Sequence, residues 1–330
     1  MRSSSAQNRS ASDRRPAEIN PLNAQRWPSL PLNEWKDTYA TLHRWTQIVG
    51  KTRLSMTPIV NHWWNATLYV SPRGLTTSTM HCGDVAFEVE FDFVDHALEI
   101  RCSHSKPVRL ALRPQSVADF YEEYRAALRG LGIDLHIHAA PNEIDDATPF
   151  AEDRVHASYN PRYANRFWRI LLESDRVFAI FRARFVGKSS PSHFFWGSFD
   201  LAVTRFSGRP APPHPGGAPH CPDWVATEAY SHEVISAGFW PGAPGMMDEP
   251  VYYAYAYPEP AGLSAASVRP REAYWHTGMK EFLLPYEAIR AAKSPDDALL
   301  DFLQSTYEAA ADLAKWDRKA LERAGLGPVT

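Results

Sequence analysis

The sequence predicts an α+β protein built as a tandem pseudo-two-fold repeat, in which each half is an antiparallel β-meander flanked by helices. Three observations predict this fold. Several segments alternate apolar and polar residues at a period of two, which is typical of half-buried strands. Other segments carry apolar stripes at helical spacing. The order of helix, strands, proline and capped helix occurs in residues 27–140 and recurs in residues 161–330.

The first half is expected to open with a helix that has Asn33 as its N-cap and that ends at Gly50. A second helix follows Ser116, which together with Asp119 forms a capping box. Apolar and polar residues alternate most clearly in the segment from Val85 to Val94. Strands are therefore expected at residues 66–70, 85–94, 98–102, 108–112 and, along one edge, 133–138.

An acidic, proline-containing segment, residues 141–160, is expected to link the halves. The second half then begins with a helix from Tyr163 to Phe185, and its last helix begins at Ser294, where Pro295 occupies the first helical position. A Pro/Gly-rich loop is expected at residues 208–222. Strands are expected at residues 194–206, 229–240 and 251–257.

Short motifs support the interpretation as a duplication. Asn61-His62-Trp63-Trp64 resembles Ser192-His193-Phe194-Phe195, and Lys51 precedes the first motif as Lys188 precedes the second. Two unrelated α+β units that share common elements are the alternative.

Composition excludes several classes of protein. Lys and Arg number 35 and Asp and Glu 38, a net charge of −3, so no basic surface for nucleic acid is expected. The chain has no apolar run of membrane-spanning length. Its three cysteines suit a reducing compartment better than a disulfide framework. We therefore expect a cytoplasmic protein without a nucleic-acid or membrane partner, with residues 1–26 as a disordered tail; the oligomeric state stays open.

The common nucleotide-binding, zinc-protease and hydrolase motifs are not found in the sequence, so no cofactor is identified. The candidate catalytic residues are His193 and His232, because imidazole is the side chain best suited to proton transfer or metal ligation near neutral pH. Candidate ligand-binding residues near them are His62, Trp63, Asp200, Arg205, Tyr230 and Trp240. Ordinary packing and backbone hydrogen bonding is the alternative at each position.

These residues predict a small-molecule-binding protein with an aromatic, histidine-lined pocket, and they leave open whether it is an enzyme. One alternative is a non-catalytic interaction module that uses an aromatic surface. Another is a metal-dependent enzyme in which His193, Asp200 and His232 form a two-histidine, one-carboxylate site. The loop residues His214, His220 and Cys221 offer a further set of zinc ligands, for which a solvated loop is the simpler interpretation.

Four segments of the chain, residues 27–31, 189–206, 228–242 and 250–260, resemble an uncharacterised bacterial family that is catalogued only as a domain of unknown function. The resemblance covers roughly residues 27–320. It implies a bacterial, cytoplasmic protein, and it carries over neither a reaction nor a catalytic residue.

Overall fold

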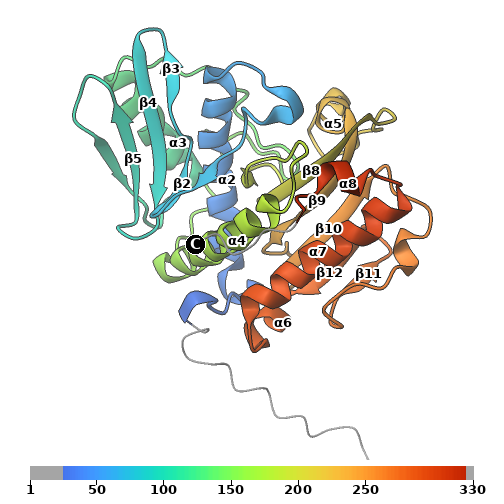
Figure 1. Cartoon of the computed structure of the whole chain (residues 1–330). Coiled ribbons are helices and arrows are strands. Elements are labelled where there is room, and N and C mark those ends of the chain that lie inside the picture. Colours follow the sequence, from blue (N-terminus) through green and yellow to red (C-terminus); the bar gives the residue numbers. More distant parts are fainter. Residues whose placement is uncertain (1–24, 325–330) are drawn as a thin grey trace, which may run out of the picture.

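The computed structural model describes residues 25–324, which form two six-stranded antiparallel sheets with helices packed on them (Figure 1). The predicted tail, residues 1–26, lies almost wholly outside the described residues. None of the helices in the described range is long and apolar enough to cross a membrane.

The first half runs from helix α2 to helix α3. Its sheet has the order β1-β2-β4-β5-β6, with β3 paired to β4. The 3₁₀ helix η1 (Asn61–Trp63) lies between α2 and this sheet. The bounds are α2 Leu32–Met56, β1 Tyr69–Val70, β2 Gly74–Thr76, β3 Met80–Cys82, β4 Val85–Asp92, β5 Ala97–Cys102, β6 Val108–Ala111 and α3 Val117–Gly130.

The second half runs from α4 to α8, and its sheet has the order β11-β12-β10-β9-β8-β7. Its helices are α4 Pro161–Ala183, α5 Asp223–Ala229, η2 Leu263–Ala265, α6 Tyr286–Ala291, α7 Pro295–Leu313 and α8 Arg318–Leu321. Its strands are β7 His193–Phe195, β8 Asp200–Pro210, β9 His232–Trp240, β10 Val251–Tyr257, β11 Tyr274–His276 and β12 Glu281–Pro285.

The α+β class and the antiparallel meanders are confirmed. When β3 and β11 are left out, each half has the same order: a helix, then five strands that are neighbours in the sheet in the order of the chain, then a helix. This shared order supports the duplication, which stays a prediction. The motif match that suggested it is wrong in detail, because residues 61–63 form a 3₁₀ helix whereas residues 193–195 form strand β7.

Two helices cover one face of each sheet. In the first half, the ring of Phe120 on α3 stacks between Trp45 of α2 and Phe91 of β4. In the second half, α4 and α7 pack side by side over the sheet (Figure 1). The opposite face of the second sheet remains free to form a site.

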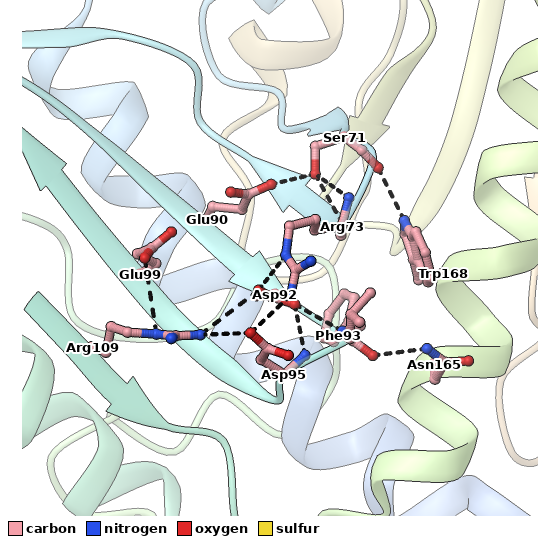
Figure 2. Close-up of polar contacts among 12 residues, drawn as sticks. Ser71, Arg73, Glu90, Asp92, Phe93, Asp95, Glu99, Arg109, Asn165 and Trp168 are labelled. Atoms are coloured by element: carbon pink, nitrogen blue, oxygen red, sulfur yellow. Dashed lines mark hydrogen bonds and ion pairs between the residues drawn. The ribbon is translucent and has the colours of Figure 1, made fainter. Parts of the chain in front are cut away.

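The halves meet where β1 lies beside β7. Leu68 and Phe194 exchange two backbone hydrogen bonds of 3.0 and 2.9 Å, which join the two sheets edge to edge. Helix α4 of the second half also bonds to the first sheet, since Trp168 donates to the Ser71 carbonyl (3.1 Å) and Asn165 to the Phe93 carbonyl (2.9 Å), as Figure 2 shows.

A charged network lies beside this junction on the first sheet (Figure 2). Arg73 pairs with Asp92 at 2.6 Å and with Asp95 at 2.9 Å, and Arg109 pairs with Asp95 at 3.1 Å. Asp92 is buried and also accepts backbone N–H groups of the turn that follows β4. The polar face of the predicted strand 85–94 is therefore partly buried, and its charges are paired.

Several predicted boundaries are wrong. The first helix continues past Gly50 to Met56, because Gly50 is a packing position and not a helix end: its Cα faces the indole of Trp196. Residues 133–138 form no strand. The expected strand 194–206 is divided into β7 and β8 by a turn. The expected strand 229–240 begins only at His232, because the chain before it forms α5. The first three residues of the predicted Pro/Gly-rich loop, 208–210, belong to β8, so residues 211–222 remain as loop.

Candidate functional site

A cavity of about 720 Å³ lies over the face of the second sheet that α4 and α7 leave free. Segments from distant parts of the chain enclose it. The end of α2 and η1 come from the first half, residues 142–143 from the segment between the halves, and residues 214–230 from the proline-rich loop and α5. A cavity of this size holds a small organic molecule.

The strand alternation of β8 places its residues on the two faces. Asp200, Ala202, Thr204 and Phe206 line the cavity, whereas Leu201 and its alternate neighbours face the helices. On β10, Tyr253 and Tyr255 line the cavity by the same rule.

Aromatic rings make up most of the cavity wall. The Trp63 indole donates to the Val225 carbonyl (2.9 Å) and lies 5.2 Å from the ring of Trp224, which is 60% exposed on α5. Together, the aromatic lining consists of Trp63, Trp64, Phe195, Trp196, Phe206, Trp224, Tyr230, Tyr253 and Tyr255.

Side chains on one face of α2 hold the chain segments at the polar end of the cavity in place through hydrogen bonds. His43, Gln47 and Lys51 are spaced by four residues and so lie on one side of the helix. His43 bonds to the Gly197 carbonyl at 2.8 Å. The Gln47 amide makes two 2.8 Å hydrogen bonds to the backbone of Asn142, one as donor and one as acceptor. Helix α2 thereby fixes both the residue that precedes Glu143 and the turn that precedes β8.

Lys51 is a buried cation without an ion pair. It is 5% exposed, and its Nζ donates to the side-chain oxygen of Asn142 and lies 5.5 Å from the centre of the Trp196 ring. Within residues 25–324 no carboxylate lies at ion-pair distance from this nitrogen. Burial lowers the pKa of Lys51 to about 8, against the opposing influence of Cys221 and Glu143.

Glu143 presents its carboxylate to the cavity. Its backbone adopts the left-handed region with φ of 62°, which is uncommon for a residue with a side chain. The carboxylate lies against the Cα of Gly197 and accepts no hydrogen bond from the described residues. Glu143 is exposed and lines the cavity. Desolvation and the nearby Asp200 raise the pKa of Glu143 to about 7, while Lys51 acts to lower it.

Asp200 is buried at the start of β8, near enough to Glu143 to influence its pKa, with 7% of its surface exposed. Its two carboxylate oxygens accept hydrogen bonds from Ser198 and from Tyr253. Burial raises the pKa of Asp200 to about 6 although both hydrogen bonds act to lower it. The cavity thus contains an ammonium and two carboxyl groups whose pKa values lie close to neutrality, which is typical of sites that transfer protons.

Four of the eight predicted site residues line the cavity: His62, Trp63, Asp200 and Tyr230. Burial lowers the pKa of His62. Its Nδ1 bonds to the Ala229 carbonyl (2.9 Å) and its Nε2 to Lys188 Nζ (2.7 Å). The Tyr230 hydroxyl bonds to that of Tyr255 at 2.8 Å.

The structure places His193 outside the cavity. Its ring is 1% exposed and packs among Trp64, Tyr69 and Phe195. Neither ring nitrogen has a hydrogen-bond partner among the described residues. Burial lowers the pKa of His193 to about 3, so the imidazole is neutral at physiological pH.

The remaining three predicted residues also lie away from the cavity wall. His232 begins β9 with its ring 5.7 Å from that of His62. Arg205 faces the helices, where its guanidinium lies 3.5 Å from the centre of the Phe181 ring. Trp240 ends β9 and packs on a small separate cluster that includes Val251.

The proposed metal sites are not assembled. Across residues 25–324, no three His, Cys, Asp or Glu side chains are grouped so that they could hold a metal ion. His193, Asp200 and His232 do not converge, because Asp200 alone of the three reaches the cavity. His214, His220 and Cys221 all line the cavity, but they form no such group either.

Sequence reasoning missed Lys51 and Glu143 as site residues. The sequence marks Lys51 only by its place before the motif at residues 61–64, and it does not show that residues 41–53 of α2 are buried on all sides. Glu143 is one acid among several in the segment between the halves. Tyr253 and Tyr255 carried a usable signal, because alternation along residues 251–257 places them on one face.

Comparison with known proteins gives a family and no further relative. No curated protein and no solved structure matches the chain. One family matches residues 27–323, nearly the whole described range. The chain belongs to that family, DUF5996, a family of unknown function.

Proposed function

We propose that this protein binds a small, ring-containing organic molecule in the cavity between its two halves. The observation that carries the proposal is the cavity itself, which combines an aromatic wall with three ionisable groups, Lys51, Glu143 and Asp200, at one end. An apolar enclosure with a few convergent polar groups is the usual form of a ligand site. The aromatic wall would stack on the ring of the ligand, and the polar end would orient its polar substituent.

The Lys51 and Glu143 side chains support an enzymatic role in this cavity. Lys51 has N–H groups to spare, and the Glu143 carboxylate has no partner among the described residues. A ligand with both an acceptor and a donor group would pair with the two side chains. A donor and an acceptor with pKa values near neutrality would then serve as acid and base.

The alternative of an aromatic docking surface has less support. In the part of the chain that the structure describes, the large aromatic residues among the exposed hydrophobics are Trp224 (60%) and Tyr274 (40%). They lie on α5 and β11, and no contiguous aromatic patch is formed from them.

Saturation-transfer NMR with indole, 2-naphthol and benzamide tests the proposal. Ala226 on α5 lines the cavity, so Ala226→Trp should fill it, whereas the neighbouring Thr227 is exposed and does not line it. We expect at least one probe to receive saturation from the wild type and from Thr227→Trp but not from Ala226→Trp. Binding by none of the probes, or equal binding by all three proteins, would contradict the proposal.

A further inference from the structure

We propose that Lys51 is a nucleophile that forms an imine with a carbonyl group of the molecule bound in the cavity. The inference rests on the proposed function and adds the chemical class of the ligand, an aldehyde or ketone attached to a ring.

The surroundings of Lys51 differ from those of a structural lysine. A buried lysine that stabilises a fold is normally paired with a carboxylate. Lys51 is instead 5% exposed, faces a cavity, and has the Asn142 side chain as its hydrogen-bond partner. Trp196 and Leu54 contribute apolar surface to the same wall. These surroundings disfavour the ammonium and leave the nitrogen in reach of a bound molecule.

The free amine is the reactive form, and its population depends on the pKa. With a pKa of about 8, Lys51 has about 300 times more free amine at pH 7 than a lysine with the ordinary pKa of 10.5. Desolvation in an apolar pocket is a recognised way to activate a lysine for attack on carbonyl carbon.

Glu143 is placed to handle the protons of the reaction. It follows Asn142 in the chain, its carboxylate faces the cavity, and a pKa of about 7 lets it give or accept a proton near neutrality. The Nζ lone pair attacks the carbonyl carbon, and one of the two amine protons passes to the carbonyl oxygen, which becomes a hydroxyl. Glu143 gives its proton to that hydroxyl, which leaves as water. The nitrogen then forms the C=N bond and releases its proton to the carboxylate. One amine and one carbonyl thus give one imine and one water, with no change in oxidation state.

Reductive trapping of the wild-type protein tests this inference without any variant. Benzaldehyde and sodium cyanoborohydride at pH 7 convert an imine to a stable secondary amine, and peptide mapping by mass spectrometry identifies the lysine. Lys36 lies on the same helix but is exposed and serves as the internal reference. We expect Lys51 to be modified at least about tenfold faster than Lys36. Equal or slower modification of Lys51 overturns the inference.

Variants locate the reaction and assign the proton step. Modification of Lys51 should be lost in Ala226→Trp and kept in Thr227→Trp, with folding checked by the thermal midpoint. Glu143→Gln should slow the labelling of Lys51 by about tenfold or more at pH 7 and remove the contribution of Glu143 to the pH profile, so that the rate follows only the deprotonation of the Lys51 amine and rises towards pH 8. An unchanged rate and pH profile would overturn the role of Glu143.

The two experiments distinguish failure of the imine from failure of the binding function. If the NMR probes bind but Lys51 is not trapped, the imine is wrong and the binding function stands. If no probe binds and lysines are labelled indiscriminately, both fail.

Discussion

Gly50 in the middle of α2 lies directly against the indole ring of Trp196, so that a Cβ at position 50 would overlap that ring. Trp196 is itself held in place, because its Nε1 donates to the Ala66 carbonyl at 2.6 Å. The contact joins a helix of the first half to the turn that leads into β8 of the second. It also forms the cavity wall beside Lys51.

Gly50→Ala should therefore destabilise the protein. In an ordinary helix interior, alanine is better than glycine by about 1 kcal/mol. Here the added methyl group must displace the indole, and overpacking of this kind costs about 1–3 kcal/mol. Denaturant unfolding gives the difference. Gly130 ends α3 and has open space where a Cβ would go, so Gly130→Ala should be neutral or stabilising. A gain in stability for Gly50→Ala would contradict the packing argument.

The buried His193 should make the protein less stable as the pH falls. Its pKa is about 3 in the folded protein, because it is buried near Arg53 and Arg182, and about 6.5 in the unfolded chain. The unfolded state therefore binds a proton that the folded state does not over this range, and stability is lost as pH decreases.

His193→Phe should remove this contribution. Between pH 7 and pH 5 we expect the wild type to lose about 2 kcal/mol more than the variant. Unfolding free energies at the two pH values measure the difference. His136 is exposed, so His136→Gln should keep the wild-type dependence. A wild-type slope in His193→Phe as well would show that this imidazole is not the cause.

Glu281 should have the opposite effect. It is buried on β12, and burial together with the charge of Asp200 raises its pKa to about 8. The folded state then holds a proton that the unfolded state releases above pH 4.5, so stability is fully present at low pH and falls as the pH rises towards 8. Glu281→Gln should be more stable than the wild type at pH 9, by about 2–4 kcal/mol, and close to it at pH 5. If the wild type and Glu281→Gln had equal unfolding free energies at pH 9, ionisation of Glu281 would not destabilise the folded protein, and the prediction would be wrong.

Arg205 is fully buried, and aromatic rings surround it where a carboxylate would be expected. Its guanidinium lies 3.5 Å from the ring centre of Phe181 and 4.2 Å from that of Tyr307, and it donates to the Phe181 carbonyl. Two of its nitrogens have no hydrogen-bond partner among the described residues.

An apolar side chain of similar length should replace this arginine at little cost. Since burying a charge is expensive, Arg205→Met should fall within about 1 kcal/mol of the wild type in chemical denaturation. Arg205→Ala should lose about 3 kcal/mol or more, because it leaves a cavity between the rings. A loss for Arg205→Met as large as that for Arg205→Ala would show that the charge itself stabilises the core.

The sequence by itself determined several of the elements and their faces. Period-two alternation identified the strand at residues 85–94 and placed Asp200 opposite Leu201, and Ser116 marked the start of α3 through the hydrogen bond that its hydroxyl accepts from Asp119. These features are local: a residue and its near neighbours in the chain fix them, so a pattern in the sequence reports them.

Only the tertiary structure decided which faces meet. Glu143 reaches the cavity because Gln47 holds the segment at Asn142. The end of α2 reaches it because the bridge between Leu68 and Phe194 joins the two halves. Both contacts are between residues far apart in the chain. The same long-range packing buried His193 and Arg205 away from the cavity. An amphipathic pattern shows that a face is covered, but it does not show what covers it, and the chemistry of this cavity depends on the covering residues.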